Sequence, residues 1–175
     1  GEWRMPNFAF RTMSFFSGLK SSFIPPKRVL EDIGVKEGDS VLDFFCGPGD
    51  YSIAASEIVG DSGRVNALDI LPYALETVER KAALNGYGNL YTIFSDLETG
   101  MKKNSVDTVL LYNVLYRTSD KKALIDEVAR IVKPGGVVSV SGSRMSRDSL
   151  INMMKRKRFI LRDSRGGIHN FSKRR

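Results

Sequence analysis

The chain has 175 residues, 42% of them hydrophobic, so it is long enough for one domain with an ordinary core and too short for two of usual size. Its apolar runs fall well short of the roughly 20 residues of a membrane span, and residues 1–20 lack a signal-peptide core. We therefore expect a soluble, cytoplasmic protein. A single cysteine, Cys46, and a single histidine, His169, exclude an internal disulfide and argue against a metal centre.

The net charge of +7 is concentrated at one end of the chain. The stretch from Arg144 to Arg175 has 11 lysines or arginines and two acids, whereas the preceding residues have 16 basic and 18 acidic side chains. This pattern predicts either a solvated charged face or a local contact with an anionic partner such as RNA.

The first 24 residues contain five phenylalanines without a clear period. We interpret residues 1–24 as an aromatic flap or lid ahead of the main domain, residues 25–175, with ordinary packing or a subunit contact as alternatives. Pro25 and Pro26 then predict the beginning of a helix that continues to Ile33.

From Ser40 onward, apolar β-type runs alternate with helical ones. The predicted strands are Val41–Phe45, Arg64–Leu68, Leu90–Phe94, Val106–Tyr112 and Val137–Ser141, and the helices between them are Tyr51–Val59, Pro72–Leu84 and Lys121–Val132. A last helix, Ser149–Lys157, precedes a hairpin of Phe159–Ser164 and Ile168–Lys173 across Gly166 and Gly167. The alternation predicts an α/β fold with a doubly wound, mostly parallel sheet, and a ligand site beyond the carboxyl ends of its strands.

The sharpest motif is VLDFFCGPGDYS, Val41 to Ser52, in which a buried strand ends in an acid and a Gly-Pro-Gly turn leads into a helix. Glycines suit this place because a side chain would block the approach of a ligand to the backbone N–H groups at the helix start. The turn departs from the dinucleotide pattern G-x-G-x-x-G by ending in Ser52, yet Asp69 follows at a distance suited to a ribose. A nicotinamide or flavin enzyme is therefore the first rival interpretation.

These residues resemble the class I S-adenosylmethionine-dependent methyltransferases from Pro25 to Lys173. Asp43 stands where the family has the acid of its first motif, Asp69 in NALDI where it has a ribose-binding acid, and Asp96 in IFSDL where it has an adenine-contacting acid. The segment from Val106 to Gly136, which closes on Lys-Pro-Gly-Gly, is similar to the family's fourth strand, its helix and the turn into the fifth strand.

The resemblance is closest to the branch of ubiquinone and menaquinone biosynthesis methyltransferases, and it implies a seven-stranded Rossmann-like sheet with a C-terminal antiparallel hairpin. Two positions depart from that branch. Phe45 replaces its usual glycine, so that DFFCG is nearer to a form seen in some RNA methyltransferases, and Tyr116 stands where many relatives have histidine.

The resemblance also implies which residues bind the cofactor, S-adenosylmethionine. Asp69 would accept hydrogen bonds from the ribose hydroxyls, Asp96 and Leu97 would hold adenine, and Asp43 would orient the turn or reach the cofactor's amino group. The full expected set is Asp43, Phe44, Gly47, Gly49, Asp69, Ile70, Asp96, Leu97 and Asn113.

No catalytic base follows from the sequence, since the sulfonium already makes the methyl group a good electrophile. Tyr116, Tyr112 and Asp50 are candidates to border the mouth of the site, whereas Cys46 is expected to pack. Three functions remain open: methyl transfer to a small, apolar or aromatic acceptor, RNA methylation guided by the basic end, and non-catalytic cofactor binding. Oligomeric state cannot be read from the sequence.

Overall fold

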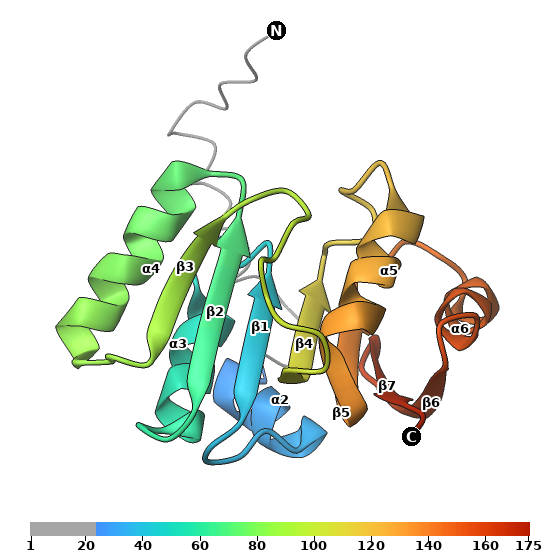
Figure 1. Ribbon diagram of the computed structural model, residues 1–175, viewed down its shortest axis with the longest axis horizontal. Helices are drawn as coiled ribbons and strands as arrows, with labels where there is room; N and C mark the ends of the chain where they lie inside the picture. The colour runs from blue at the N-terminus through green and yellow to red at the C-terminus, as the bar shows by residue number, and fades with distance from the viewer. Residues whose placement is uncertain (1–23) are drawn as a thin grey trace, which may run out of the picture.

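The computed structural model describes residues 24–175. The predicted flap therefore lies outside the described residues except for Ile24, which is exposed. Seven strands form one sheet in the order β3-β2-β1-β4-β5-β7-β6 (Figure 1). Strands β1 to β5 are parallel, and β7 runs antiparallel to both β5 and β6. The predicted doubly wound, mostly parallel sheet with a terminal antiparallel hairpin is thus confirmed.

The bounds of the elements agree closely with the sequence pattern. The strands are β1 Ser40–Phe44, β2 Arg64–Asp69, β3 Leu90–Phe94, β4 Val106–Tyr112, β5 Val132–Ser141, β6 Phe159–Arg165 and β7 Ile168–Lys173. The helices are α2 Pro26–Ile33, α3 Asp50–Val59, α4 Pro72–Asn85, α5 Lys121–Ile131 and α6 Arg147–Lys155. In the described part of the chain, no helix is long and apolar enough to cross a membrane.

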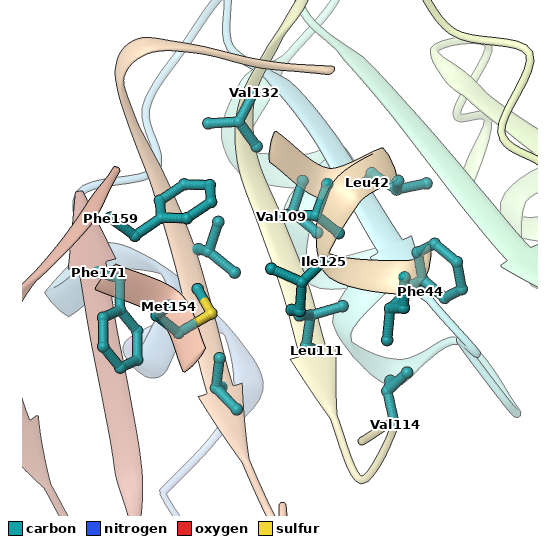
Figure 2. Close-up of a cluster of buried hydrophobic side chains, with 14 of the residues drawn as sticks. Leu42, Phe44, Val109, Leu111, Val114, Ile125, Val132, Met154, Phe159 and Phe171 are labelled. Carbon is teal, nitrogen blue, oxygen red and sulfur yellow. The ribbon is translucent and has the colours of Figure 1, made fainter. Parts of the chain in front are cut away.

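Alternate residues of the central strands face two separate cores, as the period of two in a strand requires. Leu42, Val109 and Leu111 pack with apolar side chains of α5 and α6 in the cluster drawn in Figure 2. Val41 and Leu110 point to the other face, where they pack against α2 and α3. Because both faces are covered, β1 and β4 read as nearly continuous apolar runs, which is typical of parallel strands.

Most strand boundaries lie within one residue of the prediction, and two of the differences have a clear local reason. Strand β1 ends at Phe44 because Phe45 adopts a left-handed backbone with φ of 54° and cannot continue it. Strand β5 begins at Val132 rather than Val137, since the Lys-Pro-Gly-Gly segment forms an irregularity inside the strand instead of a turn before it.

The chain order creates a switch point between neighbouring strands β1 and β4. From β1 the chain moves outward through β2 and β3, and it then returns to the other side of β1 as β4. The carboxyl ends of the parallel strands lie together at one end of the sheet, here called the carboxyl edge. The loops after β1 and β4 diverge there, and doubly wound sheets bind ligands in the crevice that this leaves.

Candidate functional site

The glycine turn joins β1 to α3 at the carboxyl edge, and its two glycines have different surroundings. Gly47 and Gly49 have left-handed φ of 53° and 80°. A Cβ at Gly47 would meet no atom within 4 Å, whereas a Cβ at Gly49 would lie 2.5 Å from Val78 Cγ2 of α4. Gly47 thus faces open space that a ligand can enter, and Gly49 lets the turn pack against α4.

Asp69, at the end of β2, fixes the same turn from the neighbouring strand. Its Oδ2 accepts the N–H of Gly47 at 2.9 Å, and its Oδ1 accepts the N–H of Leu71 at 3.0 Å. The residue is only 3% exposed. Each carboxylate oxygen retains a lone pair after these bonds, so Asp69 can still accept hydrogen bonds from two ribose hydroxyls.

Asp43 lies one strand further along, on the face covered by α3. Its Oδ2 accepts the hydroxyl hydrogen of Ser52 at 2.6 Å, which ties the strand to the first turn of α3. Burial raises the pKa of Asp43 to about 7, and the nearby charge of Asp69 adds to this rise while the Ser52 hydrogen bond opposes it. A cation placed near Asp43 would lower that pKa again. No feature of the motif indicated that Ser52 would bond to Asp43.

The loop after β3 places the expected adenine contacts at the same edge. The N–H of Ser95 donates to the carbonyl oxygen of Asp69 at 3.2 Å, so this loop is anchored on β2. Asp96 is exposed, and the N–H of Leu97 donates to Ser95 Oγ at 3.3 Å. The Leu97 amide can therefore donate to adenine only if its hydrogen bond to the Ser95 hydroxyl breaks. The sequence pattern did not indicate this hydrogen bond.

Two further expected cofactor residues differ in which part can reach the crevice. The side chain of Phe44 is 1% exposed and belongs to the core, so only its backbone faces the edge. Ile70, which follows Asp69, is 45% exposed and offers its side chain as an apolar surface.

Asn113 marks the end of β4 with a left-handed φ of 60°, and its N–H donates to the carbonyl oxygen of Ser141 at 3.0 Å. A Cβ at Gly142 would lie 2.0 Å from Asn113 Oδ1, so the glycine after β5 makes room for this side chain. Gly142 was not among the predicted site residues, because its role depends on two loops meeting in space.

The three weak candidates for catalysis occupy different surroundings. The hydroxyl of Tyr112 forms a hydrogen bond of 2.7 Å with Ser139 Oγ. Its ring packs edge-on against that of Tyr51, with centroids 4.6 Å apart. Burial raises the pKa of Tyr112, so a phenolate is disfavoured. These contacts favour a structural role for Tyr112.

Asp50 and Tyr116 are more exposed. Asp50 forms an ion pair with Lys81, with 2.8 Å between Oδ1 and Nζ, and the same ammonium donates to the carbonyl oxygen of Pro48 at 2.7 Å. Lys81 thereby holds the glycine turn from α4, a role that sequence reasoning missed. Tyr116 is 39% exposed, and the guanidinium of Arg144 lies over its ring at 4.2 Å.

Cys46 and His169 offer little nucleophilic or metal-binding chemistry. Cys46 is buried and its pKa is raised by that burial, while its N–H donates to the carbonyl oxygen of Leu68 at 3.0 Å. His169 Nδ1 lies 2.8 Å from Ser164 Oγ within the terminal hairpin. Between residues 24 and 175, no three metal-binding side chains gather into a cluster.

The basic C-terminal stretch is divided between the two ends of the parallel strands, the carboxyl edge and the opposite, amino edge. Residues 155–158 adjoin the beginning of β6, which pairs with the end of β7 at the edge where the parallel strands begin. There the backbone N–H of Arg174 donates to the Arg158 carbonyl oxygen at 2.9 Å. Arg144 and Arg165, in contrast, lie at the carboxyl edge, because Ile168 beside the hairpin turn pairs with Ser141 at the end of β5.

The residues at the carboxyl edge fit S-adenosylmethionine. The open space before Gly47 suits a ligand that approaches the backbone closely, and Asp69 has acceptor capacity for a ribose. Asp43 and Asp69 both suit a ligand with positive charge on its amino group and sulfur.

The comparisons with known proteins agree with this geometry. Residues 35–168 match a family model described as a methyltransferase domain. The demethylmenaquinone methyltransferase of Staphylococcus aureus (strain JH9) is 36% identical over 113 residues, which cover 64% of this chain and 46% of that relative. The chain therefore matches less than half the length of this curated relative.

Solved structures show the same fold at low identity. A SAM-dependent methyltransferase from Aquifex aeolicus has a TM-score of 0.79 at 19% identity, covering 97% of this chain and 98% of that one. The [4+2]-cyclase SpnF also shares the fold, with a TM-score of 0.66 at 16% identity over 78% of this chain and 59% of that one, so the fold alone does not fix the reaction. The family match over most of the chain is decisive: the protein belongs to the class I S-adenosylmethionine-dependent methyltransferases.

Proposed function

We propose that this domain transfers the methyl group of S-adenosylmethionine to a small acceptor with an apolar or aromatic body. The observation that carries the proposal is the Gly47 turn held by Asp69, which supplies a ligand-accessible backbone and a ribose acceptor at one point. The similarity to a quinone-ring methyltransferase supports an aromatic acceptor.

In this proposal the protein mainly positions the reactants. When bound, the cofactor supplies a methyl group already activated by its sulfonium, so no strong base is required. Asp69 holds the ribose hydroxyls, and Asp96 with the Leu97 amide holds adenine. Asp43 favours the cationic end of the cofactor, while Asn113 and the backbone of Phe44 border its amino group. The exposed ring of Tyr116 stands at the acceptor side of the crevice.

An RNA acceptor is the alternative, and the division of the basic stretch weakens it. Residues 155–158 and 173–175 lie at the edge opposite the crevice, so an RNA bound there would have to extend around the domain to present a base. Asp126 also engages Lys157 in an ion pair, which reduces the free positive charge of that group.

Turnover separates these functions from one another and from mere cofactor binding. The protein is incubated with S-adenosylmethionine and either 1,4-naphthohydroquinone, 4-hydroxybenzoate or total RNA, and S-adenosylhomocysteine is quantified by mass spectrometry. We expect product with a ring compound, and less product with an Asp69→Ala variant when the S-adenosylmethionine concentration is below saturation. Product with RNA alone would overturn the small-acceptor proposal, and no product with any acceptor would favour a binding module.

A further inference from the structure

Two arginines stand over aromatic rings in the loops that follow β4 and β5. The guanidinium carbon of Arg144 lies 4.2 Å from the ring centroid of Tyr116, and that of Arg117 lies 5.9 Å from the ring centroid of Phe45. Arg117 belongs to the loop after β4 and Arg144 to the loop after β5. Both side chains are exposed, so the cation–π contacts orient the guanidinium groups and leave them accessible to solvent.

The backbone under these arginines is well defined. The N–H groups of Arg117 and Thr118 donate to the carbonyl oxygen of Val114 at 2.9 and 3.2 Å, which closes the loop after β4 into a tight turn. Arg144 has a left-handed φ of 54°, a strained conformation for a residue other than glycine. Such strain persists where the surrounding structure imposes it, and it is often found at ligand sites.

The charge of the two guanidinium groups is not neutralised within the described chain. The ion pairs among residues 24–175 involve neither Arg117 nor Arg144. An arginine stacked on a ring still presents its N–H groups at the edge, in the planar arrangement that matches a carboxylate or phosphate.

The two arginines lie across the switch point from the acids of the cofactor side. Asp43 is the last residue but one of β1 and Asp69 ends β2, whereas the loops of Arg117 and Arg144 follow β4 and β5. Because Phe45 directly follows β1, the contact of Arg117 with its ring ties the loop after β4 to the loop after β1. The positive charge therefore stands on the β4 and β5 side of the switch point, apart from the acids of β1 and β2.

We infer that the methyl acceptor carries an oxyanion, a carboxylate or a phosphate, which binds the N–H edges of Arg144 and Arg117. This inference rests on the proposed function and specifies its substrate class: a small ring compound with one anionic substituent. The arginines act as specificity determinants, since a neutral analogue would leave both charges without a partner.

Binding of matched probes tests the inference without requiring turnover. The protein is saturated with S-adenosylhomocysteine and titrated by calorimetry with 4-hydroxybenzoate, phenyl phosphate and the neutral 4-hydroxybenzamide. We expect at least one anion to bind about tenfold more tightly than the amide, as charge-assisted hydrogen bonds imply. The preferred anion distinguishes a carboxylate from a phosphate acceptor.

Three variants complete the test. Arg144→Gln and Arg117→Gln should bring the affinity ratio of anion to amide close to one, while the affinity for S-adenosylhomocysteine stays unchanged. Arg156→Gln removes an exposed charge beyond α6 and should preserve the ratio. The inference is overturned if neither anion binds more tightly than the amide, or if the preference survives both substitutions. If the wild-type protein prefers an anion to the amide but methylates none of the acceptors tested for turnover, that result contradicts the proposed function and not the anion site.

Discussion

The two halves of the carboxyl edge are held in place by different means. On the side of β1 and β2, buried acids are fixed by hydrogen bonds from Ser52, Gly47 and Leu71. On the side of β4 and β5, exposed arginines rest on the rings of Tyr116 and Phe45. The acids of the first half are thus fixed by internal hydrogen bonds, as a cofactor site requires, whereas the second half presents positive charge through surface contacts that can rearrange.

This difference explains why the cofactor is easier to identify than the acceptor. Buried hydrogen-bonded acids need particular residue types at fixed points in the chain, and such needs leave a motif. Surface arginines on rings depend on two loops meeting, and a change in either loop changes the acceptor without disturbing the fold.

The largest effect is expected at the turn, where stability and binding can be separated. Gly49→Ala should lower the free energy of unfolding by about 2–4 kcal/mol, because its Cβ would clash with Val78 in a left-handed backbone. The Cβ of Gly47→Ala would meet no neighbour, so this substitution should cost only about 1 kcal/mol of stability. It should nevertheless weaken cofactor binding more than Gly49→Ala does. Urea denaturation and calorimetry measure the two quantities.

A control variant isolates the clash. Gly49→Ala should cost less stability when it is introduced into a Val78→Ala variant than when it is introduced into the wild type, because the clashing methyl group is then absent. Equal destabilisation by the two glycine substitutions would show that packing does not distinguish them.

The next effect concerns the ribose acceptor. Asp69→Ala should weaken S-adenosylhomocysteine binding by about 1–3 kcal/mol, since both the ribose and the Gly47 N–H lose a charged acceptor in a buried place. Calorimetry measures the dissociation constant, with circular dichroism to check folding. Asp148→Ala, on the first turn of α6, removes a carboxylate from the other half and should leave the affinity unchanged. An unaltered affinity in folded Asp69→Ala would remove this residue from the site.

A smaller effect is expected from pH. Burial raises the pKa of Asp43 to about 7 from an ordinary 3.8, so the carboxylate forms mainly above neutral pH. A cationic cofactor favours the carboxylate, and the affinity for S-adenosylmethionine should therefore rise by up to about tenfold from pH 6 to pH 8. Asp43→Asn should flatten this dependence, and a parallel rise in wild type and variant would assign the titration to another group.

The same shift has a consequence for folding with a definite sign. The folded state holds the Asp43 proton more tightly than the unfolded chain does, so the associated stabilisation is present in acid and is lost as pH rises through about 7. Denaturation of wild type and Asp43→Asn across this range should show a steeper decline for wild type.

The sequence predicted the fold and the positions of Asp43 and Asp69 near the carboxyl ends of their strands, because each left a local signal. Alternating apolar runs marked the strands, and the acids at their ends marked the crevice, since the carboxyl ends of parallel strands meet at one edge. The paired glycines Gly166 and Gly167, both with positive φ, also marked the hairpin correctly.

The partners that hold those acids could not be predicted in the same way. Lys81 binds Asp50 beside the glycine turn, although the two residues are 31 positions apart in the chain. Gly142 makes room for Asn113, which lies in a different loop. Ser95 occupies the Leu97 amide through a side chain whose direction no periodicity specifies. The basic stretch looked continuous in sequence, but a helix and a hairpin send its residues to opposite edges.

Crystals of the protein grown with S-adenosylhomocysteine would test the central claim most directly. Electron density should place both ribose hydroxyls within hydrogen-bonding distance of the Asp69 carboxylate, and the amino-acid end before Gly47, with Arg117 and Arg144 left free on the other side of the switch point. Ligand density away from the Gly47 turn, or a ribose that does not contact Asp69, would contradict the division of the edge into a cofactor half and an acceptor half.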